Sequence, residues 1–259
     1  MKFSKNRLYF IGFTAIIIST IQQIIYFSYE FIVYLGYIAD VIIMVCAILI
    51  RFYFINPEET ADFLNQTDIL NDKSNKKLKP NRFIDSMFLA MIVGTIASIT
   101  IHYNFIIGVF FYLIMQIIHI YAFSGIIHYA PKLVFTNKAG SVKKPAIIST
   151  IGFIMFIPIL YVTMIIPTWG LYSLFVLPYV LVLVLMTLIT YWGLGYINRP
   201  LRFRIMLCLG ASFFLFSDLM IGYSVFDPFY LAPLLIYPTW ILAIFFMQLA
   251  VLELIPKEV

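Results

Sequence analysis

The sequence predicts an all-α integral membrane protein with eight transmembrane helices and with both termini in the cytoplasm. Three observations lead to this fold class. Hydrophobic residues make up 63% and charged residues 11% of the 259 residues, which leaves too little polar surface for a soluble domain of this length. Apolar runs of about 20 residues, the length that a helix needs to cross a bilayer, recur along the chain. The basic residues fall only in alternate segments around these runs, as expected if all of them lie on one side of the membrane.

The first four runs cover residues 8–28, 31–54, 83–101 and 105–124. Three basic residues at positions 2, 5 and 7 precede the first run, and six lie between residues 51 and 82, around the connection after the second run. Four more, between residues 132 and 144, follow the fourth run, whereas the connections after the first and third runs contain none. Because Lys and Arg accumulate in cytoplasmic loops, the first helix leaves the cytoplasm and the second returns to it.

The last four runs cover residues 146–166, 170–192, 204–225 and 230–252. Arginines at positions 199, 202 and 204 follow the sixth run and Lys257 follows the eighth, whereas the connections after the fifth and seventh runs contain no basic residue. Adding or removing one helix would break this alternation. We therefore expect eight spans with cytoplasmic N- and C-termini.

The chain is expected to form a single membrane domain over residues 1–259, with cytoplasmic loops at about 56–82 and 124–145. The net charge of +5 is explained by these loops, so that no nucleic-acid partner is implied. Cys46 and Cys208 both fall inside predicted helices, which argues against a disulfide framework. No nucleotide-binding loop and no metal-ligand spacing occurs, so we expect neither a cofactor nor a metal. The expected partner is a membrane lipid.

Three acidic residues lie within predicted spans. Asp85 is close to Arg82 at the start of its helix, where an acid is favourable. Asp218 lies about 21 Å from Arg204 along its helix, and Asp40 lies about 14 Å from the start of its own helix at 1.5 Å per residue. The two are therefore at similar depth in the membrane, so that both could face one cavity. For both, a buried structural acid that hydrogen-bonds a neighbouring helix remains open beside a functional role, because intramembrane charges are costly.

Other polar residues in the spans have the same two interpretations. Gln116 and His119 share a face of the fourth predicted helix. A lone membrane histidine more often bonds another helix than acts in catalysis, and Gln248 on the last helix is read in the same way. The many Phe and Tyr residues are interpreted as lipid contacts and interfacial belts.

Two stretches of the sequence carry a family resemblance. In "GASFFLFSDLMIGYSVF" and "NFIIGVFFYLIMQIIHIYAF", the pattern residues are Gly210, Ala211, Phe214, Ser217, Asp218, Phe226, Phe105, Gly108 and Phe123. They resemble the YhhN-like lysoplasmalogenase family of eight-helix membrane proteins, over roughly residues 83–252. The last helix, with Gln248 at the family's glutamine, is similar as well.

The resemblance implies a hydrolase that cleaves the vinyl-ether bond of a lysolipid and releases a fatty aldehyde and a glycerophospho-base. Some family positions differ: Gln116 replaces a histidine, His119 a tyrosine, and Thr95 the aspartate of a Gly-Asp pair, while a Lys-Pro of the second helix has no counterpart and Asp40 lies in that region. On this basis the candidate catalytic residues are Asp218, Asp40 and His119. The candidate substrate-binding residues are Ser217, Thr95, Gln116 and Gln248.

Vinyl-ether chemistry suits such a site. Hydrolysis begins with protonation of an alkene carbon, which requires a carboxylic acid that holds its proton near neutral pH, and then requires a base to direct water. We expect Asp218 to face an enclosed polar cavity and to serve as the proton donor. The alternatives are a non-catalytic relative that binds a lipid or small molecule, and a proton-coupled transporter that uses Asp40 and Asp218. A retinal protein is excluded because no Lys lies within a predicted span.

Overall fold

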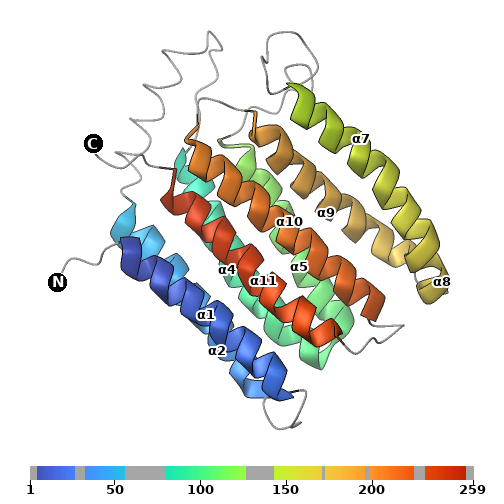
Figure 1. The fold of residues 1–259 in the computed structure, drawn as a ribbon, viewed down its shortest axis with the longest axis horizontal. Coiled ribbons are helices and arrows are strands. Elements are labelled where there is room, and N and C mark those ends of the chain that lie inside the picture. Colours follow the sequence, from blue (N-terminus) through green and yellow to red (C-terminus); the bar gives the residue numbers. More distant parts are fainter. Residues whose placement is uncertain are drawn as a thin grey trace.

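The computed structural model describes residues 5–26, 33–55, 80–126, 143–170, 173–195, 199–224 and 231–254. Most of the two loops predicted at 56–82 and 124–145 lies outside these residues. Over the described part, the chain forms helices and short turns, without a strand. Eight long helical segments run roughly along one common direction (Figure 1).

The eight segments coincide with the eight predicted apolar runs, and their ends differ from the predicted ends by three residues at most. They are α1 (Lys5–Tyr26), α2 (Val33–Leu49) with its π-helical extension η1 (Ile50–Phe54), α4 (Pro80–Tyr103), α5 (Phe105–Phe123), α7 (Lys143–Leu160) with η3 (Tyr161–Ile165) and α8 (Ile166–Trp169), α9 (Ser173–Gly193), α10 (Leu201–Ser224) and α11 (Ala232–Leu252). The wider turn at η3 follows Pro158, which cannot donate a backbone hydrogen bond and so disturbs regular α-helical bonding.

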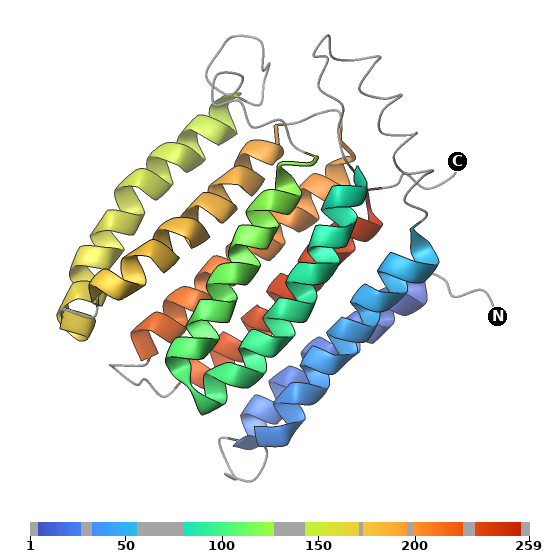
Figure 2. The ribbon, with the colours of Figure 1, turned by 180° about the vertical axis from the view of Figure 1, so that it is seen from behind.

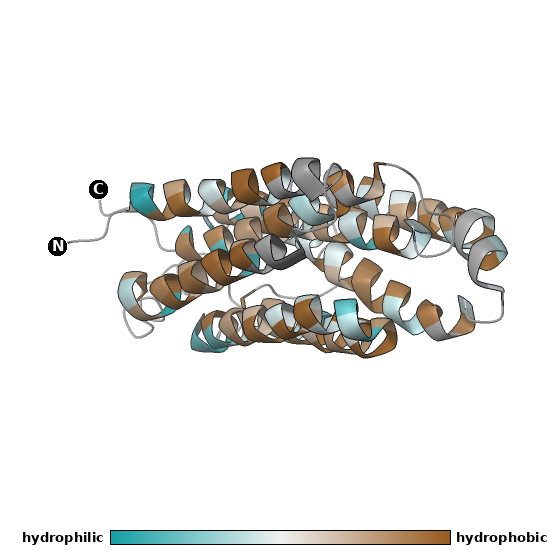
Figure 3. Cartoon of the chain, turned by 90° about the horizontal axis from the view of Figure 1, so that it is seen from below, coloured by the Kyte–Doolittle hydropathy of each residue, from teal (hydrophilic) through white to brown (hydrophobic). Residues whose placement is uncertain are grey.

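Five of these helices, α4, α5, α9, α10 and α11, are long and apolar enough to cross a membrane. Hydrophobic residues make up much of each helix (Figure 3), and many of them are exposed. Among them, the side chains of Phe10, Ile106 and Ile148 are 74%, 79% and 69% exposed, which suits contact with lipid rather than water. The other three predicted spans are also helical, and their crossing of the membrane stays a prediction.

Two helical hairpins form the centre of the bundle. α10 packs along α11 and α4 packs along α5; Figure 1 shows α10 and α11 in front of α4 and α5, and Figure 2 shows α4 and α5 from behind. α1 and α2 cover one flank, where they contact α11 and α4, while α9 covers the other flank and contacts both α5 and α10. The interior between the hairpins is therefore closed on both sides.

The first and last described helices meet at the same end of the bundle. Tyr9, near the start of α1, donates a 2.6 Å hydrogen bond to Oε1 of Glu253, just after α11. The eight described helical segments alternate in direction, which produces this arrangement. At the start of α4, Asp85 forms a 2.7 Å ion pair with Arg51, and its side chain is 57% exposed. Asp85 thus pairs with a basic residue of a neighbouring helix, a contact that the sequence did not predict.

The sidedness of the bundle can be tested at its two ends. Tyr103, in the turn between α4 and α5, and Ser124, just after α5, are both exposed. If the basic loops are cytoplasmic, an impermeant maleimide should label Tyr103→Cys in intact cells and Ser124→Cys only after permeabilisation. The native cysteines are buried and give little background. The opposite labelling pattern would invert the predicted topology.

Close packing of α10 on α11 depends on Gly210. A Cβ atom built at Gly210 would lie 2.7 Å from Cγ of Met247 and 2.9 Å from the carbonyl oxygen of Ala243. These distances are shorter than van der Waals contact, and the carbonyl belongs to the backbone. The two helices can therefore approach this closely only because residue 210 has no side chain, as is common between membrane helices.

We expect Gly210→Val to destabilise the protein by about 1–3 kcal/mol, the usual cost of overpacking an interior. The measurement is the detergent-solubilised thermal midpoint. Gly152→Val on α7 is the matched control, since a Cβ atom there meets no atom within 4 Å. Equal midpoints for the two variants would show that α10 and α11 do not pack as closely as described.

Candidate functional site

Asp218 lies where α5, α9 and α10 converge. Its side chain is 7% exposed. The Tyr179 hydroxyl of α9 donates a short hydrogen bond to Oδ2 of Asp218, and Nε2 of Gln116 on α5 donates to the same oxygen over 3.3 Å. Among the described residues, no hydrogen bond reaches Oδ1. Oδ1 is therefore the oxygen on which a proton can reside without displacing an existing donor.

A small cleft of about 50 Å³ opens beside Asp218 between α5, α9 and α10. Apart from Asp218, only Tyr112 and Tyr179 contribute polar side-chain atoms to it. The other lining residues are Ile101, Phe105, Val109, Val176, Val180, Leu183, Leu219, Ile221 and Gly222. The predicted polar cavity is thus wrong: the acid faces a mainly apolar cleft, because α9 and α10 present mostly aliphatic residues there and α5 presents Phe105, Val109 and Tyr112.

Asp40 is held at a second junction, between α2, α4 and α11, and is 2% exposed. Ser98 Oγ donates a 2.6 Å hydrogen bond to Oδ2, and Trp240 Nε1 donates a 3.2 Å bond to Oδ1. Both carboxyl oxygens therefore accept a hydrogen bond from a neighbouring helix.

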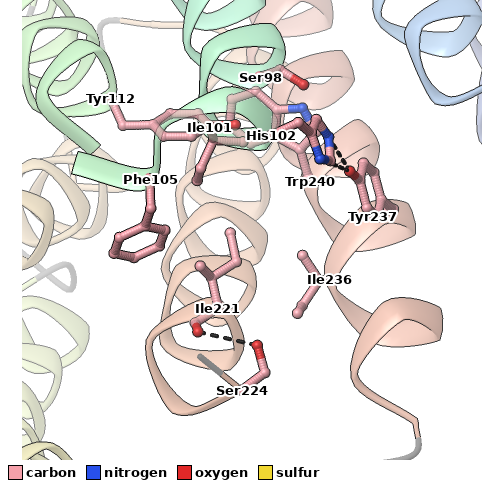
Figure 4. Close-up of a pocket in the computed structure, with 10 residues that line it drawn as sticks. All are labelled: Ser98, Ile101, His102, Phe105, Tyr112, Ile221, Ser224, Ile236, Tyr237 and Trp240. Atoms are coloured by element: carbon pink, nitrogen blue, oxygen red, sulfur yellow. Dashed lines mark hydrogen bonds between the residues drawn. The ribbon is translucent and has the colours of Figure 1, made fainter. Parts of the chain in front are cut away.

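A larger cleft of about 200 Å³ lies next to the two donors of Asp40. Figure 4 shows its lining residues, which are Ser98, Ile101, His102, Phe105, Tyr112, Ile221, Ser224, Ile236, Tyr237 and Trp240. The Tyr237 ring stacks on the His102 ring at 5.8 Å between centroids, and its hydroxyl hydrogen-bonds Nε2 of His102. Tyr237 is near the start of α11, so this cleft is at the bundle end opposite Glu253.

Tyr112 on α5 lies between the two acids. It lines both clefts and is 4% exposed. Its ring makes edge contacts with Trp240 at 5.0 Å and with Phe214 at 6.4 Å between centroids. One tyrosine therefore borders the cleft beside Asp218 and also contacts Trp240, a donor to Asp40.

Three other candidate residues bond the helix backbone. Thr95 donates to the carbonyl of Met91 in its own helix over 3.0 Å. Ser217 donates to the carbonyl of Ile236 on α11 over 3.1 Å, and Gln248 Nε2 donates to that of Met87 on α4 over 3.3 Å. None of the three lines either cleft described above. Ser217 and Gln248 thus link helices, as polar residues in membrane bundles commonly do.

The remaining candidate, His119, is buried among aromatic rings. Its side chain is 2% exposed, stacks on Phe123 at 5.9 Å and meets Phe214 edge-on at 6.5 Å between ring centroids. In the part of the chain that the structure describes, no hydrogen bond joins His119 to Asp40 or Asp218. Gln116, one turn earlier on the same helix face, is the residue that hydrogen-bonds Asp218.

The sequence interpretation missed four residues of the site: Ser98, Tyr112, Tyr179 and Trp240. Each has a hydrogen-bonding group within a predicted span, which is the signal that was available. The tyrosines were assigned to lipid contacts and interfacial belts, yet Tyr112 is buried and Tyr179 bonds Asp218. Within the described residues, no group of three or more His, Cys, Asp or Glu side chains is placed to hold a metal ion.

Comparison with known proteins gives a family. No curated protein and no solved structure matches the chain. The sequence profile of the YhhN family matches residues 69–251, a range that includes Asp218, Gln116, Tyr179 and Trp240 but not Asp40. This match covers well over half of the chain and includes all five helices that are long and apolar enough to span a bilayer. The protein is a multi-pass integral membrane protein that belongs to the YhhN family.

Proposed function

We propose that the protein hydrolyses the vinyl-ether bond of a lysoplasmalogen, with Asp218 as the proton donor. Membership of the YhhN family, to which lysoplasmalogenases belong, supports the reaction class. The observation that carries the proposal for this chain is the position of Asp218: a buried acid on the wall of an apolar cleft, with both of its donors on Oδ2.

The first step forms a carbon–hydrogen bond. Asp218 transfers the proton of Oδ1 to the alkene carbon that is not bonded to the ether oxygen, and Asp218 becomes a carboxylate. The substrate becomes an oxocarbenium ion. Tyr179 and Gln116 hold Oδ2 and so fix the orientation of Oδ1, and their hydrogen bonds stabilise the carboxylate that this step leaves behind.

The second step adds water to the oxocarbenium carbon. Asp40 accepts the proton that this water loses, and its own position is fixed by Ser98 and Trp240. As the resulting hemiacetal breaks, its hydroxyl proton passes to the glycerol oxygen, which gives a fatty aldehyde and the free hydroxyl of the glycerophospho-base. The proton held by Asp40 then returns to Asp218, so that both acids are restored. One water is consumed, and no oxidant or reductant is needed.

A second candidate function is binding of a lipid without catalysis. The contacts of Asp218 favour it in one respect, because they join α5, α9 and α10 and would also suit an architectural acid. The absence of an aspartate at Thr95 points in the same direction. In this alternative the clefts hold a lipid and the carboxyl group only links helices.

Purified protein in detergent, given a lysoplasmalogen, distinguishes the two functions. We expect release of fatty aldehyde from the vinyl ether and none from the saturated ether analogue, because only the vinyl ether can be protonated at carbon. The rate should be unchanged by a metal chelator, since the proposed proton transfers, from Asp218 to carbon and from water to Asp40, need no metal. If no aldehyde forms under conditions in which another family member releases it, the lipid-binding alternative is correct.

A further inference from the structure

We propose that a single lysolipid spans both clefts, with the start of its hydrocarbon chain beside Asp218 and its glycerophospho end beside His102 and Tyr237. This inference rests on the proposed function for its substrate. It assigns each end of that substrate to one of the two clefts, and it places the scissile bond where the two clefts meet. Nothing in the reaction class fixes this orientation.

The two clefts adjoin along one wall. Four residues line both of them: Ile101, Phe105, Tyr112 and Ile221. Tyr112 also makes edge contacts with Trp240, which bonds Asp40, and with Phe214. A linear molecule that lies across Tyr112 would therefore touch both clefts, with Asp218 on one side and Ser98 and Trp240, the donors to Asp40, on the other.

The smaller cleft suits a hydrocarbon chain. Apart from Tyr179 and Asp218, its walls from α9 and α10 are apolar, with Val176, Val180 and Leu183 on α9, and apolar side chains offer no hydrogen-bond partner to a headgroup. Its 50 Å³ is less than the volume of two liquid water molecules at about 30 Å³ each. Only the chain carbons closest to the ether fit inside, and the rest of the chain must continue along α5 and α9 into lipid. Selectivity for chain length should therefore be weak.

The larger cleft suits the polar end of the molecule. Ser98, His102, Ser224 and Tyr237 supply hydroxyl and imidazole groups to its wall (Figure 4). They come from the ends of α4 and α10 and the start of α11, near the end of the bundle, where a headgroup can remain hydrated. Neutral donors and acceptors of this kind can bind the hydroxyl groups and phosphate oxygens of a glycerophospho-base.

The direction of the chemistry agrees with this orientation. The carbon that receives the proton belongs to the hydrocarbon chain, and the ether oxygen belongs to glycerol. With the chain in the smaller cleft, the proton-accepting carbon lies on the side of Asp218 and the glycerol oxygen lies on the side of Ser98 and Asp40. The reverse orientation would place the headgroup among valines and leucines.

Photo-crosslinking with two uncleavable probes tests the inference. Both are saturated 1-O-alkyl lysophosphatidylcholines; one has a diazirine on a chain carbon close to the ether and the other has it on the headgroup. With the full-length protein in nanodiscs, we expect the chain probe to label peptides of α9 and the middle of α10. We expect the headgroup probe to label the end of α4 and the start of α11. Excess unlabelled lysolipid should suppress both.

A matched pair of variants on α9 sharpens the test. Val176→Phe, which partly fills the smaller cleft, should reduce labelling by the chain probe several-fold. Leu181→Phe, at a position 58% exposed on the outer surface, should not. A reversed map, or labelling of neither cleft, overturns the inference even if hydrolysis occurs. Because the probes cannot be hydrolysed, the expected map without aldehyde release keeps the two subsites and removes only the proposed catalysis.

Discussion

Replacement of Asp218 by asparagine should abolish aldehyde release while leaving the protein folded. Asparagine keeps the size of the side chain and can still accept hydrogen bonds from Tyr179 and Gln116 through its carbonyl oxygen. It has no acidic proton to give to carbon. General acid catalysis contributes about 10²–10⁴-fold to a rate, so we expect a loss of at least about 100-fold in turnover.

The measurement compares turnover and thermal midpoint for Asp218→Asn and for Asp85→Asn. Asp85 is the matched control because its exposed pair with Arg51 should contribute at most about 1 kcal/mol to stability and is at the other end of α4 from the clefts. Asp85→Asn should therefore keep its activity. If Asp218→Asn instead lowers the thermal midpoint and keeps the turnover of wild type, the acid is architectural and the proposed mechanism is wrong.

The helices of this protein could be predicted from the sequence because the bilayer imposes their length and the loops record their orientation. A span needs about 20 apolar residues whatever surrounds it, so runs such as 105–124 required no knowledge of partners. These features depend on local composition and on the membrane.

The site depends on how the helices are rotated and paired, which local composition does not record. Ser217 and Asp218 are consecutive in the sequence, yet Ser217 bonds a carbonyl of α11 while Asp218 faces α5 and α9. Trp240 reaches Asp40 across 200 positions of sequence. Such contacts arise from close packing at positions like Gly210, and a single sequence does not reveal which faces meet.

The position of Thr95 connects the two acids of this chain to the family pattern. The family resemblance of the sequence implies an aspartate at the position of Thr95. Thr95 is one turn before Ser98 on α4, so that both project from the same face of the helix. Ser98 is the residue that bonds Asp40. A carboxyl group at position 95 would therefore come close to the place that Asp40 occupies from α2. We infer that Asp40 supplies from a second helix the acid that the family places on α4.

This substitution of one acid by another predicts a rescue. Asp40→Asn should reduce aldehyde release at least about 100-fold, the lower range for loss of a catalytic acid or base, and the double variant Asp40→Asn/Thr95→Asp should recover a substantial part of it. Asp40→Asn/Thr100→Asp is the control. Thr100 projects about 140° away from Thr95 around α4, so an aspartate at position 100 adds the same charge at a different place.

Wild-type turnover in Asp40→Asn would remove Asp40 from the mechanism. Equal recovery in both double variants would mean that added charge, rather than its position, restores activity. Recovery in the Thr95→Asp double variant alone would show that a carboxyl group from α2 or from α4 can act at the same place, between Ser98, Trp240 and Tyr112. Only a shared location makes the two positions interchangeable.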